Sequence, residues 1–408
     1  MTDDFSRYAL IIFCLFAGIE FLVVRLRGHE YRLNSTLSNL CIAMLALVMG
    51  YFFILIDVGI YVWIYNHWRL VQLPGPWLWI FAFVAYDFCY YWLHRCNHRI
   101  NFFWATHIVH HSGEDLNLTT TLRVGPAGFL FNWLFYFPLA IFGVPLPVYL
   151  AMGSLNLIYS FWVHTTEVGS LGWFDRFFGS PSNHRVHHGQ NEYCIDRNYG
   201  GVFMIWDHIF RSFSDEKPRE PIVFGTRGGL SRWNPVAATT HQFGELWAQS
   251  RHAPNWRAAI LLWLRSPGSI AGGGKSQALP SPDRFVKYDV RPDAGIQAYL
   301  VGQFAVTLAI TAYIFTCLPT WPVAMTLAAA LLIVAKMWIV GAFLECDPRA
   351  VRGEMMWWLA ALVPAGYLGP WHGATLIAGG AASIFILLSL SPPRTRTAGG
   401  KRIDPNPS

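Results

Sequence analysis

The chain has 408 residues, of which 54% are hydrophobic and only 13% are charged. This apolar content exceeds that of an average globular protein, so much of it is expected to face lipid. The net charge of +6 suits an anionic membrane surface, and no basic stripe interleaved with aromatic residues indicates a nucleic-acid partner. Four of the seven cysteines fall inside apolar stretches, which excludes a disulfide framework.

Apolar segments long enough to cross about 30 Å of hydrocarbon, roughly 20 residues each as helices, occur in two groups. The predicted spans are residues 8–24, 36–56, 77–93, 125–143 and 146–163, and then 297–317, 320–345, 355–371 and 374–391. Several contain Gly, Pro or a charge, so some are expected to be re-entrant rather than to cross. The predicted fold is therefore all-α, a polytopic membrane helix bundle.

The distribution of Lys and Arg predicts the orientation of these spans. Residues 1–5 carry two Asp and no basic residue, whereas three Arg follow the first span, so the amino terminus is expected outside. Alternate crossings then place residues 94–123 and 164–296 in the cytoplasm. The prediction is a multi-pass protein of the plasma or inner membrane in a bacterium, or of the endoplasmic reticulum in a eukaryote. No cleavable signal peptide is expected.

Changes in composition divide the chain into five segments. Residues 1–75 hold the amino-terminal spans and 76–245 a histidine-rich region, while 246–296 read as a cytoplasmic linker because they include a Gly/Ser/Pro stretch. Residues 297–392 hold the carboxyl-terminal spans, and 393–408 form a cytoplasmic tail.

Nine of the fifteen histidines fall between residues 94 and 188, in clusters. They are His94, His98, His107, His110, His111, His164, His184, His187 and His188. Residues three or four apart share one face of a helix, so each cluster presents its imidazoles together. Imidazole is a ligand of Fe, Cu, Zn and Ni, and nine such ligands exceed the capacity of one ion. The pattern predicts a site for two metal ions.

Two other interpretations of the histidines explain less. A lone histidine at a membrane surface is usually only a polar residue, but nine clustered and unliganded rings would leave many hydrogen-bonding groups unsatisfied. Zinc needs three or four ligands and would leave the remaining histidines unexplained. Asp87, seven residues before His94 in an apolar run, is expected to accept an imidazole N–H and orient the ring, or else to make a hydrogen bond between packed helices.

Three histidine boxes carry a resemblance to a known superfamily. The segments His94-Arg-Cys-Asn-His98, His107-Ile-Val-His-His111 and His184-Arg-Val-His-His188 resemble those of the fatty acid hydroxylase and sterol desaturase superfamily of membrane di-iron enzymes. Longer stretches around residues 110–120, 161–164 and 181–201 resemble its alkylglycerol monooxygenase branch. The likeness covers about residues 35–245, and the extra carboxyl-terminal spans also fit that branch.

The resemblance implies a di-iron centre ligated by the nine histidines, O2 as oxidant, a lipid substrate and a tetrahydropterin or other external electron donor. It implies hydroxylation beside the ether oxygen of an alkylglycerol, after which the hemiacetal collapses to an aldehyde and glycerol. Glu114, after the second box, would be a required catalytic acid; its alternative role is to cap a helix. Asn183 departs from the family pattern, which typically has histidine at that position.

The sequence also allows other functions. A hydroxylase or desaturase of fatty acids, sterols or carotenoids would share the same metal site. A membrane metal transporter would need a file of polar residues through the spans, which is not seen. A zinc hydrolase is weaker still, because the chain has no H-E-x-x-H motif.

Overall fold

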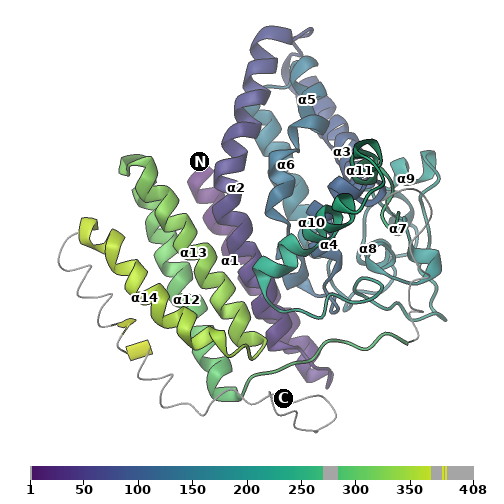
Figure 1. The fold of residues 1–408 in the computed structure, drawn as a ribbon. Coiled ribbons are helices and arrows are strands. Elements are labelled where there is room, and N and C mark those ends of the chain that lie inside the picture. Colours follow the sequence, from purple (N-terminus) through teal and green to yellow (C-terminus); the bar gives the residue numbers. More distant parts are fainter. Residues whose placement is uncertain (1, 270–283, 369–378, 381, 384–408) are drawn as a thin grey trace. The chain divides into compact units, whose positions relative to one another are not determined.

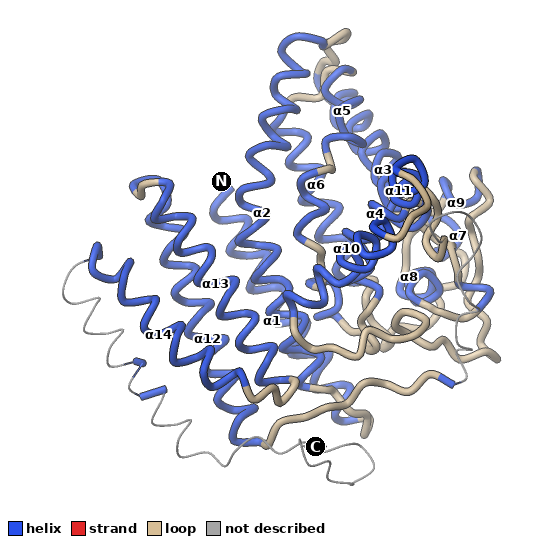
Figure 2. The backbone as a smooth tube through the Cα atoms, in the orientation of Figure 1, coloured by secondary structure: helices blue, strands red, loops and turns tan. Residues whose placement is uncertain are grey.

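The computed structural model describes residues 2–269, 284–368, 379–380 and 382–383, with side chains described from residue 13 onward except at residues 319 and 363–368. Within these residues the secondary structure is helical, with two isolated β-bridges and no named strand (Figures 1 and 2). The all-α fold class is therefore confirmed. The predicted span at 374–391 and the tail at 393–408 lie essentially outside the described residues.

The first part of the chain contains most of the helices. They are α1 (Thr2–Leu26), α2 (Leu33–Trp68), α3 (Gly75–Arg99), α4 (Asn101–His111), η1 (Leu118–Leu122), η2 (Pro126–Leu130), α5 (Trp133–Ile141), α6 (Leu146–Trp162), α7 (Phe174–Phe177), α8 (Pro181–His188), η3 (Glu192–Cys194) and α9 (Ile205–Ile209). The later elements are α10 (Pro235–Arg251), α11 (Trp256–Leu264), α12 (Ala294–Cys317), η5 (Leu318–Thr320), α13 (Val323–Leu344) and α14 (Arg349–Leu368).

Three described helices are long and apolar enough to cross a membrane: α2, α12 and α13. The protein is a membrane protein, and the count of nine crossings remains a prediction. Helix α2 has 36 residues and a length of about 54 Å, so it continues well past the predicted end at residue 56.

The segment 125–143, predicted as a span that could be re-entrant because it contains Gly and Pro, forms two short helices, η2 and α5, instead of one. Gly125 lies so close to α4 that a Cβ atom there would stand 2.0 Å from the carbonyl oxygen of Thr106. Pro126 begins η2, the helical backbone is interrupted at Phe131 and Asn132, and Pro138 lies inside α5.

The chain forms two compact units. The first comprises residues 1–31, 50–230 and 240–286, and the second residues 32–49, 231–239 and 287–408. In the first unit α3 packs against α4, α5 and α6. Its core includes stacked tyrosines, with the rings of Tyr61 and Tyr149 centred 4.3 Å apart.

Helices α10 and α11 fall largely within or beside the segment predicted as a linker. Asn101, which begins α4, donates through its side-chain amide to the carbonyl oxygen of Leu262 in α11 over 2.8 Å. Ala105, Leu246 and Leu262 form a small buried cluster beneath this contact. Part of the predicted linker therefore supports the helix that carries the second histidine box.

The second unit packs α12, α13 and α14 around an apolar core. Lys336 and Glu354 form an ion pair in this core, and each side chain is only 1% exposed. The hydroxyl of Tyr299 and the indole N–H of Trp358 both donate to the Glu354 carboxylate. These bonds satisfy a charge that would otherwise be costly to bury.

Candidate metal centre

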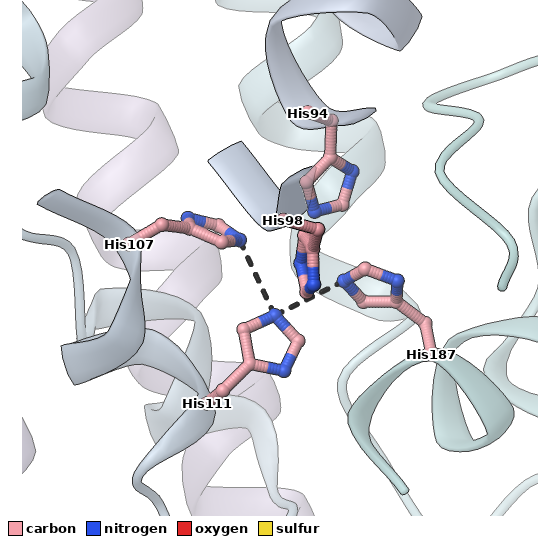
Figure 3. A group of neighbouring side chains, drawn as sticks. All are labelled: His94, His98, His107, His111 and His187. Atoms are coloured by element: carbon pink, nitrogen blue, oxygen red, sulfur yellow. Dashed lines mark hydrogen bonds between the residues drawn. The ribbon is translucent and has the colours of Figure 1, made fainter. Parts of the chain in front are cut away.

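All nine predicted ligands meet within the first unit. His94 and His98 end α3, the second box ends α4, His164 follows α6, and the third box lies on α8. The nine side chains form two groups, each with its nitrogen atoms within 4.8 Å of one another. The first group is His94, His98, His107, His111 and His187 (Figure 3), and the second is His110, His164, His184 and His188.

In the first group the Nε2 atoms converge on one point. The Nε2 atom of His111 lies 3.2 Å from that of His107 and 3.1 Å from that of His187. The Nε2 atoms of His94 and His98 are buried and have no hydrogen-bond partner among the described residues. Five imidazoles from three helices therefore face a common space, as Figure 3 shows.

The second group has the same arrangement. The Nε2 atom of His164 lies 3.2 Å from that of His110 and 2.7 Å from that of His184. The Nε2 atom of His188 lies 3.0 Å from that of His184. Two nitrogens bound to one ion at about 2.1 Å and at right angles would stand about 3.0 Å apart, so these separations match those of ligands to a shared metal.

Backbone carbonyl groups fix the tautomers of four rings. The Nδ1 atoms of His94, His110, His164 and His187 donate to the carbonyl oxygens of Tyr199 (2.9 Å), Arg123 (3.3 Å), Ser160 (2.7 Å) and Arg197 (2.9 Å). Because a carbonyl oxygen can only accept, Nδ1 carries the proton and Nε2 keeps its lone pair. The lone pairs of His110 and His164 thus face each other, an arrangement that a cation between them would stabilise.

Burial keeps these rings in the form that binds metal. It lowers the pKa of His111 and His188 well below the ordinary value for histidine, and neighbouring imidazoles lower it further. A neutral imidazole is the ligating species. The residues present therefore fit a metal on the evidence of their burial, tautomers and spacing.

The Asp87 carboxylate accepts no hydrogen bond from an imidazole, so the predicted bond is wrong. Its oxygens accept from the backbone N–H groups of Val202 (2.7 Å) and Phe203 (3.1 Å) and from the indole of Trp206 (2.8 Å). The loop that it holds contains Tyr199, whose carbonyl oxygen orients His94. Asp87 therefore acts on the His94 ring through this loop and makes no hydrogen bond to it.

The loop at residues 196–201 closes over the first histidine group. The ring of Tyr199 is 5.4 Å from that of His98, centre to centre, and is almost fully buried. Asp207 holds the loop by accepting from the N–H groups of Tyr199 (2.9 Å) and Gly200 (2.7 Å). A Cβ atom on Gly201 would meet the Asn156 amide at 2.8 Å, so this position requires glycine.

Asn183 has a local structural role. Its side-chain oxygen accepts from the Ser180 hydroxyl (2.9 Å), and its backbone N–H donates to that hydroxyl at the start of α8. It belongs to neither histidine group. The residue that departs from the family pattern thus helps to begin the helix of the third box.

Glu114 is buried beyond the end of α4, which stops at His111, so it does not share a helix face with that ligand. Asn117 caps the next helical turn, so Glu114 is not its cap. Glu114 interacts electrostatically with the buried guanidinium of Arg123. That group donates to the carbonyl oxygen of Val109 over 2.7 Å, within the second box.

Sequence reasoning missed Arg123 and Asp207. Both act through their neighbours: the carbonyl of Arg123 orients His110, and Asp207 holds the loop that orients His94. Neither lies at a ligand spacing from a histidine box. Asp87 was noticed because a carboxylate in an apolar run is costly, and the same signal could have drawn attention to Asp207, which lies in the largely apolar run 202–210.

A cavity of about 430 Å³ opens from both histidine groups into the helices of the first unit. His94 and His107 of the first group line it, together with His110, His164 and His184 of the second. The rest of its wall comes mainly from α2, α3, η2 and α6 and is mostly apolar.

One side of the cavity reaches the outer surface of the helices. Ile54 on α2 and Leu150 and Leu157 on α6 line the cavity and are also exposed, by 44%, 42% and 62%. Such apolar side chains at the rim suit contact with lipid tails. The cavity can therefore take an apolar chain and present it to both metal positions.

The comparisons with known proteins agree with this geometry. Residues 79–212 match the fatty acid hydroxylase family. The chain is 34% identical over 331 residues to alkylglycerol monooxygenase of Homo sapiens, covering 80% of this chain and 74% of that protein. The chain belongs to the alkylglycerol monooxygenase family. It is accordingly an oxidoreductase of the monooxygenase class, and the transporter and hydrolase alternatives are not favoured.

Other relatives define the breadth of the likeness. The alkylglycerol monooxygenase of Danio rerio is 37% identical over 287 residues, covering 69% of this chain and 64% of that protein. An ornithine lipid hydroxylase of Rhizobium tropici is 28% identical over 169 residues, covering 41% and 51%. No solved structure shows a significant match. This member of the alkylglycerol monooxygenase family thus also resembles a second lipid hydroxylase over part of its length.

Proposed function

We propose that this chain is a di-iron monooxygenase that cleaves the ether bond of alkylglycerols, with one iron in each histidine group. The observation that carries the proposal is that two imidazole groups border one mostly apolar cavity. The names of the most similar relatives support the substrate class. Imidazole is a suitable iron ligand, and no carboxylate belongs to either group.

The reaction inserts one oxygen atom of O2 into the C–H bond next to the ether oxygen. The second atom leaves as water, with two electrons and two protons from an external donor, for which we propose a tetrahydropterin. The hemiacetal formed then breaks its carbon–oxygen bond to give an aldehyde and free glycerol. When bound, the irons supply the O2 chemistry, and the protein supplies position and exclusion of water.

The residues of this chain would divide that work. The carbonyls of Tyr199, Arg123, Ser160 and Arg197 hold four imidazoles in the ligating tautomer. Apolar side chains on α2 and α6 would hold the alkyl chain, with the carbon beside the ether oxygen nearest the histidines. Burial of the site limits the access of water to the reacting carbon.

The direct test is metal content and turnover of the purified full-length protein. We expect two irons per chain, and release of aldehyde from a 1-O-alkylglycerol that depends on both O2 and tetrahydropterin. Protein stripped of iron should be inactive and should recover when iron is restored. Active protein with one zinc and no iron would contradict the proposed centre. Turnover of a fatty acid or sterol, with none of any alkylglycerol, would contradict the substrate class.

We further propose that the histidine boxes face the cytoplasm and that the amino terminus lies outside. The uneven distribution of Lys and Arg supports this orientation. Reporter fusions at residues 5 and 170 should report opposite sides of the membrane. An amino-terminal reporter on the same side as the reporter at residue 170 would reverse this part of the proposal.

We propose that Glu114 is required for activity because its negative charge offsets that of Arg123. Arg123 supports the second box through its hydrogen bonds to Val109 and His110. Glu114→Gln keeps the size of the side chain but leaves a buried guanidinium without its counter-charge. Mutation of a residue that supports metal ligands typically lowers metal affinity or activity about 10–100-fold. We expect turnover to fall by that factor in Glu114→Gln, with the iron retained. The measurement is alkylglycerol turnover alongside iron content.

The matched control is the adjacent acid, Asp115→Asn, which also removes one negative charge but at a less buried position. It should stay within a few-fold of the unmodified protein. Equal turnover of the two variants would remove the special role of Glu114. If Glu114→Gln lost its iron, the expectation that iron is retained would be wrong, and Glu114 would be needed to hold the metal site together.

A further inference from the structure

Glu20 is a buried carboxylate in the apolar helix α1, which precedes every histidine box. The residue is 5% exposed and is not part of the cavity wall. Its Oε1 atom accepts from the Thr165 hydroxyl over 2.6 Å, and its Oε2 atom accepts from the backbone N–H of Leu118 over 2.8 Å. The Tyr31 hydroxyl adds a longer bond of 3.4 Å to Oε2. The carboxylate therefore joins α1 to two segments that follow histidine ligands.

Thr165 connects this carboxylate to three ligands of the second group. It directly follows His164 and is 6% exposed. Its carbonyl oxygen accepts from the guanidinium of Arg185 over 3.2 Å. Arg185 lies in the third box, between the ligands His184 and His188. A shift of Thr165 would therefore reach His164 through the chain and the other two ligands through Arg185.

The second segment that Glu20 holds leads to the fourth ligand of this group. Leu118 begins η1, and Arg123 directly follows the end of that helical turn. The backbone carbonyl of Arg123 orients the ring of His110. The two oxygens of one carboxylate thus hold both segments that carry or orient the ligands of the second group.

Two further contacts attach α1 to the same region. Arg27 forms an ion pair with Glu167 over 2.6 Å, and the ring of Phe13 lies 4.7 Å from that of Phe161, centre to centre. The Arg27 side chain is 57% exposed, and ion pairs at exposed positions contribute little. The buried hydrogen bonds of Glu20 are therefore the stronger polar connection between α1 and these segments.

We propose that Glu20 is a positioning residue that holds the second histidine group together, which makes α1 part of the metal centre. This inference rests on the proposed function, because it concerns retention of the second iron. Asp87 holds the loop whose carbonyl orients His94 in the first group. Each group then has one buried carboxylate that acts on its ligands through the backbone around them.

The first measurement is iron content and steady-state kinetics of Glu20→Ala. Without the carboxylate, the Thr165 hydroxyl and the Leu118 N–H lose their acceptor, and a buried donor without an acceptor is costly. We expect iron to fall from two to about one per chain and kcat to fall about 10–100-fold, as is typical for residues that support metal ligands. The KM for a 1-O-alkylglycerol should stay within a few-fold, because Glu20 does not line the cavity.

The spectrum of the remaining iron shows which group is affected. His188→Ala removes a ligand of the second group, and His187→Ala removes a ligand of the first. The Mössbauer spectrum of the iron left in Glu20→Ala should match that of the iron left in His188→Ala. A match to His187→Ala would contradict the assignment of Glu20 to the second group.

Glu20→Gln separates positioning from a role of the charge. Glutamine keeps one oxygen that can accept from the Leu118 N–H, and its amide can donate to the Thr165 hydroxyl oxygen. Both segments then stay joined to α1, so iron content and kcat should return to within a few-fold of the unmodified protein. Loss of kcat in Glu20→Gln with both irons present would mean that the negative charge itself is needed, which contradicts a positioning role.

The matched control for Glu20→Ala is Asp175→Ala. Asp175 is also 5% exposed and also accepts from one hydroxyl and one backbone N–H, those of Ser170 (2.6 Å) and Leu171 (2.9 Å). This variant should lower thermal stability by a similar amount and keep both irons. Equal loss of iron from the two variants would mean that destabilisation alone explains the result for Glu20.

Thr165→Val provides a milder change if Glu20→Ala does not accumulate in the membrane. It removes the hydroxyl that donates to Glu20, keeps the shape of the side chain and should also lower the content of the second iron. Two irons and unchanged kcat in Thr165→Val and in Glu20→Ala would overturn this inference alone. An unmodified protein that binds no iron would overturn the proposed function instead.

Discussion

Replacement of His187 by alanine is expected to abolish turnover and to remove iron from the five-imidazole group. His187 is the ligand through which α8 joins the first group, and its Nε2 lies 3.1 Å from that of His111. Its Nδ1 is held by the carbonyl of Arg197, which directs its Nε2 toward the other imidazoles of the group. Removal of a metal ligand should lower turnover more than removal of a residue that only supports a ligand. We therefore expect turnover to fall about 100-fold or more.

The measurement is turnover of an alkylglycerol together with iron per chain in the purified protein. His208→Ala is a suitable control, because His208 is exposed on α9 and belongs to neither group; its ring contacts the carbonyl of Arg176 and stacks on Phe213. Membrane insertion should be unchanged in both variants, since it depends on the apolar spans. If His187→Ala kept more than a few per cent of turnover, its role as a ligand would have to be withdrawn.

Replacement of Asp87 by alanine is expected to destabilise the protein and to release iron, although Asp87 contacts no ligand directly. The change leaves two backbone N–H groups and the Trp206 indole without their acceptor. Each buried unsatisfied donor costs about 1–3 kcal/mol, so the sum reaches several kcal/mol. The loop would then no longer hold the Tyr199 carbonyl against His94.

Thermal unfolding and iron retention should both fall in Asp87→Ala, and less in Asp87→Asn, which keeps one acceptor oxygen. A matched control is Asp175→Ala, a similarly buried acid that accepts from the Ser170 hydroxyl and the Leu171 N–H away from the metal centre. It should lower stability without loss of iron. Iron lost equally from both variants would mean that destabilisation alone explains the result for Asp87.

The amino-acid sequence by itself determined the class of fold and the set of candidate ligands. Apolar runs of membrane length predict helices whatever they pack against, because the backbone must satisfy its own hydrogen bonds in lipid. The i, i+4 spacing of His94 and His98, of His107 and His111, and of His184 and His188 places each pair on one helix face. Each of these pairs indeed stays together in one group.

Only the tertiary structure decided how the nine ligands divide. His110 belongs to the second box in sequence but lies in the same spatial group as His184 and His188. Conversely, His187 belongs to the third box but lies in the group of His107 and His111. Neighbouring residues on a helix point about 100° apart, so consecutive histidines can serve different groups once α4 and α8 lie face to face. Spacing along one helix cannot reveal this exchange, because the partner helix follows more than seventy residues later.

The supporting residues were decided by tertiary structure for the same reason. The sequence drew attention to Asp87 but not to the loop that it holds, since the two are separated by 115 residues or more. Likewise, the segment predicted as one span at 125–143 is interrupted between η2 and α5, and its first residue, Gly125, packs against α4. An apolar residue is expected to avoid water, because the hydrophobic effect has no preferred direction. Which residue it contacts depends on which helices the folded chain brings together.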